Sequence, residues 1–416
     1  MKKRTKILFL LPAVLIFIAA AVAVYVWHQP ATLYAETPRT PTTHIQHTTP
    51  TDLPEGCFET LLLHVMPDDQ NYMFSPFSLR MALAMTANGA ENETQVEILT
   101  TLGIEDPAQL NKETAAFILA ANDNQQIELN IANSIWFNHD FFGDDTVDFN
   151  ETFRNTIQRY FHGAAQRITN RNGADTVNRW IADQTNDLIT DIVTSEMVAE
   201  SLALLVNAIY FKGDWQRPFT ANATRPETFT DRNGVTSTLD FMHRSCNFAY
   251  YENENFQLLA KPYTDPDFRM YFVLPRTEER PLFSEIEAAI PHMETTFVHL
   301  RLPRFTTQTR HENIPLLLQA MGIRTAFCGI TAEFGPMFTT LPTHWPVYIT
   351  DIVQKTFITV DELGTEAAAA TVVMPAPASA PAAMPIPFHC DRPFLYFIRN
   401  NQTGDILFMG EFAFAE

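Results

Sequence analysis

The stretch LLVNAIYFKGDWQRPF (residues 204–219) decides the fold. It belongs to a nearly continuous apolar run from Leu202 to Phe211, which is typical of a strand buried on both faces of a sheet. Apolar periodicity and helix-capping residues predict helices near residues 58–65, 76–89 and 178–192, and a capping box of Thr94 and Glu97 predicts another at 94–103. Strands are expected near 270–274, 296–302, 394–398 and 406–414. Because helices cluster early and strands late, we expect an α+β fold.

Length and composition exclude several classes of protein. The chain has 416 residues, of which 46% are hydrophobic, so it can bury a sizeable core. Its 28 Lys and Arg against 48 Asp and Glu give a net charge of −20, which repels phosphate backbones and excludes nucleic acid as an expected partner. The 33 Phe residues rule out wholesale disorder.

Motifs for catalysis, metals and cofactors are absent from the sequence. It contains no GxSxG, HExxH, GxGxxG or phosphate-binding loop, so we do not expect an enzyme or a bound cofactor. The four cysteines are far apart and form no CxxC pair, which leaves no expected metal site. One or two disulfides and four reduced core thiols both remain open for Cys57, Cys246, Cys328 and Cys390.

The first 27 residues read as a membrane-targeting segment. Four cations within residues 1–6 precede an uncharged apolar run of 21 residues from Ile7 to Trp27, long enough to span a bilayer as a helix. We favour an uncleaved anchor through residues 7–27 over a cleaved signal peptide. The cations keep this end in the cytoplasm and place the rest outside it, membrane-anchored or, after cleavage, secreted.

The remainder divides into a linker and a folded domain. Residues 28–52 are rich in Pro and Thr and predict an extended spacer, so the folded part is expected at 53–416.

Residues 361–388, DELGTEAAAATVVMPAPASAPAAMPIPF, do not fit a compact domain. Five prolines after residue 374 exclude a helix or a central strand, although the segment lies between two strand-like runs. Loops of this length are usually functional or disordered. The small residues from Thr365 to Thr371 favour a helix through alanine content, but they also fit a narrow strand slot. A low-complexity surface insertion is the alternative reading.

Four motifs in order resemble the serpin family over about residues 53–416. They are NYMFSPFSLRMALAMTANGAENETQVEIL (71–99), LLVNAIYFKGDWQRPF (204–219), DELGTEAAAAT (361–371) and DRPFLYFIRNNQTGDILFMGEF (391–412). The resemblance implies three largely antiparallel sheets, about eight or nine helices and an exposed reactive-centre loop within about 362–388. It also implies a monomeric, irreversible inhibitor of serine or cysteine endopeptidases. The protease cleaves the loop, is held as a covalent acyl-enzyme, and is trapped as the loop inserts into the central sheet.

The resemblance assigns the loop residues. The hinge corresponds to Glu362, Gly364, Thr365, Glu366, Ala367, Ala368, Ala369 and Ala370. Counting from Gly364 as the family does gives Ala378–Ser379 as the reactive bond, with Met384 as the alternative bait residue. A small apolar residue at the cleavage site suits elastase-like or subtilisin-like proteases. Pro375 and Pro377 shorten the hydrogen-bonded part of an inserted strand and are expected to slow insertion.

The resemblance also assigns residues beneath and above the point where the sheet opens. Ser78, Asn207 and Gln354 match the buried cluster called the shutter. The family usually has histidine where this chain has Gln354, so we expect a shutter that does not titrate near neutral pH. Trp215 and Arg304 match the breach at the top of the sheet, where an ion pair between Arg304 and Glu362 is expected. The remaining alternative is a non-inhibitory serpin acting as a protease substrate, carrier or chaperone.

Overall fold

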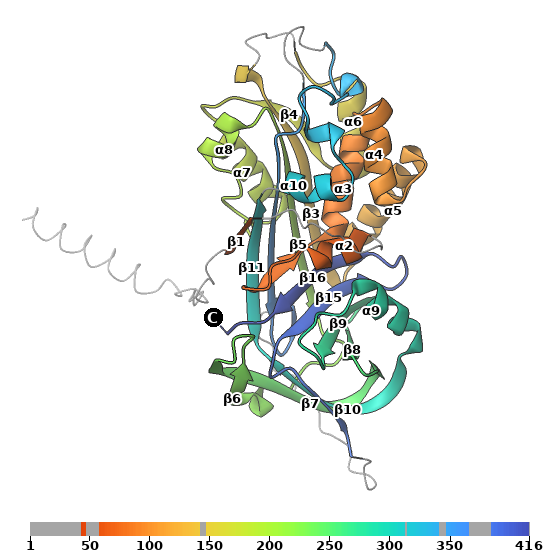
Figure 1. The fold of residues 1–416 in the computed structure, drawn as a ribbon, viewed down its shortest axis with the longest axis vertical. Coiled ribbons are helices and arrows are strands. Elements are labelled where there is room, and N and C mark those ends of the chain that lie inside the picture. The colour runs from red at the N-terminus through yellow and green to blue at the C-terminus, as the bar shows by residue number, and fades with distance from the viewer. Residues whose placement is uncertain are drawn as a thin grey trace, which may run out of the picture. The chain divides into compact units, whose positions relative to one another are not determined.

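The computed structural model describes residues 43–46 (backbone only), 58–141, 147–312, 314–340, 347–365 and 384–415 (Figure 1). These residues form two hydrogen-bonded sheets packed with nine α-helices. The helices are α2 (Phe58–His64), α3 (Pro76–Ala87), α4 (Asn92–Leu102), α5 (Pro107–Asn122), α6 (Glu151–Phe161), α7 (Gly173–Gln184), α8 (Ser195–Glu200), α9 (Phe283–Ala289) and α10 (Ile314–Ala320). The predicted α+β class is confirmed.

The first, central sheet has seven strands. Their order is β1 (Thr43–Gln46), β11 (Phe305–Glu312), β12 (Asp351–Val360), β13 (Gly364–Thr365), β5 (Ala203–Asp214), β3 (Ile127–Asn138) and β4 (Ala164–Ile168). Helices cover both faces of this sheet, with α7 and α8 on one side and α3 to α6 on the other (Figure 1). Strand β5 is therefore buried along almost its whole length, as its apolar run predicts.

The second sheet has nine strands. Its order is β14 (Ile386–His389), β10 (Glu294–Pro303), β7 (Thr236–Glu252), β8 (Phe256–Pro262), β9 (Phe268–Pro275), β15 (Phe394–Asn400), β16 (Ile406–Phe412) and β2 (Tyr72–Phe74), with β6 (Arg225–Thr230) also paired to β7. Three separate sheets were expected. Two of them share β7, which has 17 residues. It pairs with β6 over 236–241, with β10 over 241–250 and with β8 over 249–252, so hydrogen bonding joins the two sheets.

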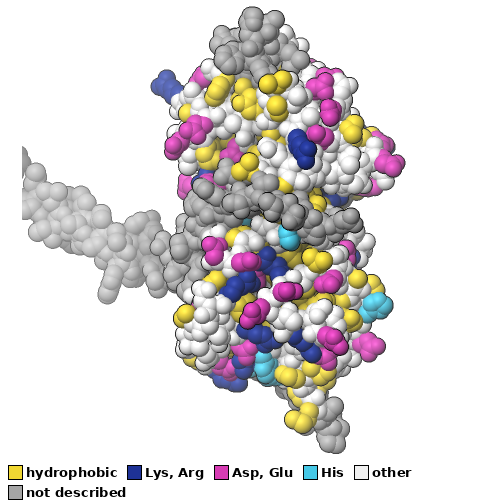
Figure 2. Space-filling view, in the orientation of Figure 1, with side chains coloured by type: hydrophobic (Ala, Val, Ile, Leu, Met, Phe, Trp, Pro, Cys, Tyr) yellow, Lys and Arg dark blue, Asp and Glu magenta, His cyan; other side chains and the backbone are white. Residues whose placement is uncertain are grey.

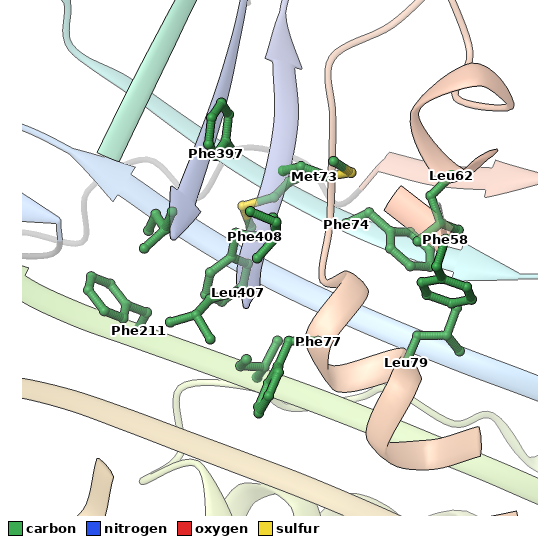
Figure 3. Close-up of a cluster of buried hydrophobic side chains, with 14 of the residues drawn as sticks. Phe58, Leu62, Met73, Phe74, Phe77, Leu79, Phe211, Phe397, Leu407 and Phe408 are labelled. Carbon is green, nitrogen blue, oxygen red and sulfur yellow. The ribbon is translucent and has the colours of Figure 1, made fainter. Parts of the chain in front are cut away.

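The main core lies where α2 and α3 meet strands of both sheets. Figure 3 shows Phe58 of α2 beside Phe74 of β2, and Phe77 of α3 near Leu407 of β16. All of these side chains are at most 7% exposed. Burying one such side chain contributes about 1.5–3 kcal/mol, so this cluster fixes the helices against the strands.

Two predicted helices differ from the structure. Helix α4 begins at Asn92 with Glu91 as its N-cap residue. The predicted capping box of Thr94 and Glu97 is wrong because both side chains bind other segments, at Glu333 N and Thr325 N. Helix α7 covers Gly173–Gln184 rather than 178–192. It stops early because Asn186 and Asp187, which follow the C-cap residue Thr185, have positive φ angles of 52° and 61°.

Part of the predicted linker belongs to the central sheet. Strand β1 (Thr43–Gln46) pairs in parallel with β11, from Thr43↔Thr309 to Gln46↔Glu312. Pairing at a sheet edge requires only backbone donors and acceptors, so a segment too polar to form a core can still join a sheet there. The linker is therefore shorter than residues 28–52.

Within the described ranges, no helix is long and apolar enough to cross a bilayer. The predicted anchor, residues 7–27, lies outside the described residues. Cys246, Cys328 and Cys390 are free thiols, which agrees with the reduced-core alternative for these three. No cluster of His, Cys, Asp or Glu among the described residues could hold a metal ion.

Candidate functional site

The central sheet is closed at one end of the β12–β5 pair and open at the other. The two strands pair directly in parallel from Asp351↔Leu204 to Thr356↔Ile209. Beyond that point β13 lies between them, where Thr365 pairs with Val360 of β12 and with Gly213 of β5. Two residues of the predicted hinge thus already occupy a slot in the sheet.

Gly364 sits where a side chain has no room. A Cβ atom built on it would clash with the carbonyl oxygen of Gly213 and lie 2.8 Å from Cα of Asp214. The glycine is therefore required by the close approach of β5.

Thr365 follows it into the slot. Its side chain is fully buried, and its Oγ1 lies 2.7 Å from the hydroxyl of Tyr263. A small polar side chain fits this place, whereas a longer or charged one would lose its solvation without a partner.

Glu362 holds the chain just before the slot. Its carboxylate accepts hydrogen bonds from Arg304 Nε at 2.9 and 3.0 Å and from Arg304 Nη2 at 2.5 Å. The expected Arg304–Glu362 ion pair is thus confirmed. Burial opposes ionisation of Glu362, but the hydrogen bonds from Arg304 and Thr224 outweigh it and lower its pKa.

Trp215 closes the same end of the slot. Its backbone N–H donates to Leu363 O at 2.7 Å and its indole Nε1 donates to Asp361 O at 3.0 Å. Its ring stacks on Tyr263 with centroids 4.6 Å apart. The structure therefore brings Trp215 together with Arg304, Glu362 and Thr365 in one cluster at the open end, which we call the hinge cluster.

A second cluster lies at the closed end, between α3 and three neighbouring strands. Asn207 donates from Nδ2 to Ser78 O at 2.9 Å and accepts from Gln354 Nε2 at 2.8 Å. Gln354 exchanges two hydrogen bonds with the backbone of Ser75, at 2.7 and 3.0 Å. All four residues are fully buried. We call Ser75, Ser78, Asn133, Asn207 and Gln354 the amide cluster.

A histidine lies beside the amide cluster, although none was expected there. His311 of β11 pairs in register with Gln354 of β12. It is fully buried and its Nε2 lies 2.6 Å from Met73 O. The shutter position itself carries Gln354, and the nearby imidazole lies on the adjacent strand β11. That the shutter does not titrate near neutral pH stays a prediction.

The comparisons with known proteins agree with this arrangement. The family model described as Serpin (serine protease inhibitor) matches residues 58–414. The chain is a member of the serpin family. Among its relatives, a serpin-like protein of Thermococcus kodakarensis is 31% identical, with 82% of this chain and 80% of that protein covered. Human neuroserpin is 30% identical over 84% of this chain and 87% of its own.

Solved structures show the same fold. The native structure of the thermophilic serpin tengpin matches with a TM-score of 0.78 and 26% identity, covering 91% of this chain and 98% of that one. Human thyroxine-binding globulin, solved with its hormone, matches with a TM-score of 0.73 at 22% identity. Serpins are generally protease inhibitors rather than catalysts, but the family includes such carriers.

Several residues assigned from the serpin resemblance lie outside the described residues. These are Glu366, Ala367, Ala368, Ala369, Ala370, Ala378 and Ser379. The alternative bait residue, Met384, is described and its side chain is 92% exposed. It stands two residues before β14, at the C-terminal end of the reactive-centre segment.

Sequence reasoning missed Tyr263, Thr224, Ser75 and Asn133 as parts of these serpin clusters. Asn133 carried a usable signal, because it interrupts an apolar strand just as Asn207 does, and the two pair in register. Tyr263 carried none, since its partner Thr365 lies 102 residues away along the chain.

The surface charge of this serpin is uneven despite its net charge of −20. Figure 2 shows Asp and Glu side chains over the whole visible face, while Lys and Arg side chains gather in its lower half. Carboxylates lie among these cations, as in the ion pairs of Arg301 with Glu227 and of Arg304 with Asp240.

Proposed function

We propose that this serpin is a suicide-substrate inhibitor of serine or cysteine endopeptidases. Its protease would cleave the reactive-centre loop, remain attached as an acyl-enzyme, and be trapped as the loop enters the central sheet. The observation that carries the proposal is the position of Gly364 and Thr365 in the slot between β12 and β5. Insertion would extend a strand that has already begun.

The residues after Thr365 suit further insertion. Apart from Glu366, they are alanines up to Ala370, which a narrow slot accepts without steric cost. A strand of about 14 residues would span on the order of 45 Å. At roughly 0.5–1.5 kcal/mol per hydrogen bond, it would gain on the order of 10 kcal/mol. A gain of that size makes the uncleaved state kinetically trapped.

The bait residue remains a proposal drawn from the family's spacing. Ala378–Ser379 is the bond we propose, and its small side chains favour elastase-like or subtilisin-like proteases. Met384 is the competing residue, but cleavage there would leave an inserting strand six residues longer.

The test is incubation with pancreatic elastase and with subtilisin, followed by denaturing electrophoresis and intact-mass measurement. We expect a covalent complex that survives denaturation, with a cut between residues 376 and 385. The control is the same protease with its active-site serine blocked, which can dock but cannot acylate. If elastase-like and subtilisin-like proteases all cleaved the loop and none formed a covalent complex, inhibition would be refuted.

The second candidate is a non-inhibitory serpin, for which Pro375 and Pro377 are the supporting observation. Proline cannot donate to a sheet, so slow insertion would let the acyl-enzyme hydrolyse first. Replacing both prolines with alanine separates the cases: a complex formed only by the variant assigns substrate behaviour to the natural chain.

We also propose a location. The apolar run at residues 7–27 would anchor a monomeric inhibitor with its folded domain outside the cytoplasm, or release it if cleaved. Protease added to intact cells should degrade the domain, and its survival would argue against this topology.

A further inference from the structure

Three histidines form a row across three adjacent strands of the second sheet. His243 of β7 and His299 of β10 have ring centroids 5.5 Å apart, and His299 lies 5.5 Å from His389 of β14. Strand pairing places them on one face, because His243 and His389 both pair with Arg301. We call these three residues the histidine row.

The charged groups around the row come from every strand that packs against it. Strand β6 contributes Arg225 and Glu227, and Glu227 lies 2.9 Å from His243 Nε2. Strand β10 contributes Arg301, which forms ion pairs with Glu227 at 3.1 Å and with Asp391, just after β14, at 2.8 Å. An uncharged side chain, Ser245 of β7, also contacts the row: its Oγ lies 2.8 Å from His299 Nδ1.

These charges already balance while the histidines are neutral. Glu227 already forms ion pairs with Arg225 and Arg301, and Asp391 forms one with Arg301, so a histidine that takes up a proton must share its carboxylate with an arginine. Burial, followed by the arginines, lowers the pKa of His299. Burial also lowers the pKa of His243 and His389. Arg301 adds to this effect at both residues, and together with burial it outweighs the opposing effect of the nearby carboxylates Glu227 and Asp391. A free imidazole therefore protonates at a higher pH than one held in the row.

Acidification must consequently weaken the arrangement. A pKa lowered by the structure means that the assembled row is stable above the ordinary histidine value of about 6.5 and loses stability as pH falls below it. The separated strands can take up protons that the assembled row resists.

Strand β14 is the least firmly attached of the strands that carry the histidine row. It has four residues, and among the described strands only β10 pairs with it. Its other attachments are the buried ring of Phe388, a hydrogen bond from Gln257 Nε2 to Pro387 O at 3.2 Å, and the contact of Cys390 N with Arg301 O at 2.9 Å. It also directly follows the reactive-centre segment.

We propose that the histidine row is an acid-sensitive latch that holds β14, and with it the C-terminal end of the reactive-centre loop, on β10. Protonation places up to three additional positive charges beside Arg225 and Arg301 and releases β14. The release of β14 in acid does not depend on the proposed function. Only its consequence rests on that function: acid would remove one of the attachments that hold the C-terminal end of the reactive-centre loop.

Hydrogen exchange measured by mass spectrometry tests the latch on the full chain without any protease. Exchange of residues 386–390 is compared at pH 7.5 and pH 5.5, with times scaled for the intrinsic rate. We expect protection to fall several-fold in acid, because the released strand takes up protons that the assembled row resists. The combined variant His243→Gln, His299→Gln and His389→Gln should keep its protection at both pH values.

Two further variants control the result. His292→Gln removes an exposed histidine just before β10 and should behave as the natural chain. The single variant His299→Gln should retain only part of the acid response. Because it changes one residue, it tests the latch even if the combined variant fails to fold. Labelling of the buried Cys390 thiol by a disulfide reagent active in acid should rise in parallel.

An equal acid response in the natural chain and the histidine variants would overturn the latch, as would unchanged protection in the natural chain. Because no protease is present, failure of inhibition would leave this result intact. Conversely, a chain that traps proteases but shows no acid response would refute the latch alone.

Discussion

The two ends of the β12–β5 pair differ in what lies between the strands. At the open end, two backbone residues of β13 separate the strands and are fixed by the hinge cluster. At the closed end, the strands bond to each other and the amide cluster ties both to α3. The comparison teaches that, under the proposed mechanism, insertion would begin at the open end and would be opposed by buried hydrogen bonds at the closed end.

This difference explains how the central sheet could accept an inserted strand between β12 and β5 and yet not open spontaneously. Extending β13 would require breaking the direct pairs from Thr356↔Ile209 downward. Each buried bond lost without replacement costs about 1–3 kcal/mol, so the amide cluster acts as a barrier. In the proposed mechanism, cleavage of the loop would supply a free strand whose hydrogen bonds replace those lost.

The largest expected effect comes from blocking the open end. Thr365→Arg would place a charge at a fully buried position beside Tyr263, which costs several kcal/mol. We expect covalent complex formation to fall by about 100-fold or more, because each 1.4 kcal/mol is a factor of ten. Densitometry of gels over a time course measures this.

Thr220→Arg is the matched control, since Thr220 is exposed and lies outside the slot. Complex formation by that variant should be unchanged. Equal trapping by Thr365→Arg would mean that loop insertion does not pass through this slot.

The next effect concerns the closed end. Asn207→Ala would remove the side chain that links Ser78, Asn133 and Gln354 and would leave buried polar groups unpaired. The free energy of unfolding should fall by about 2–4 kcal/mol. Urea titration followed by tryptophan fluorescence would measure the loss.

The exposed Asn233→Ala serves for comparison and should change stability by less than about 0.5 kcal/mol. If Asn207→Ala were no more destabilising than this control, the amide cluster would not be the barrier described above.

The smallest effect belongs to the Arg304–Glu362 pair. Glu362→Gln should lower the free energy of unfolding by about 1 kcal/mol at pH 7, a modest value because Arg304 is 46% exposed. Since the pKa of Glu362 is lowered, its contribution is present above the usual value of 4.5 and is lost as pH falls through the lower folded-state value. Urea titrations from pH 7 to pH 3 should show the two proteins converging in acid.

Asp240→Asn provides the control, because that carboxylate lies 3.6 Å from Arg304 but is 51% exposed. It should change stability little at any pH. A constant gap between Glu362→Gln and the natural chain across the whole range would contradict an ionic role for Glu362.

The sequence predicted the features that depend on a local residue pattern or on a motif shared with the family. The apolar run of β5, the strand pair at the C-terminus and the pairing of Arg304 with Glu362 were all readable in advance. The end of α7 was not, because it depends on left-handed backbone at Asn186 and Asp187. Tyr263 and Asn133 entered the clusters only through long-range pairing, which no local pattern carries. The joining of two expected sheets through β7 likewise depends on how far one strand runs.

Strand β1 gives the central sheet a neighbour at its β11 edge. A bare edge exposes a row of unpaired N–H and C=O groups that can bind a strand from a second molecule. Residues 43–46 occupy that row from Thr309 to Glu312. The segment ahead of the domain therefore guards the molecule against self-association, and a chain trimmed to residue 58 would be more prone to aggregate through this edge.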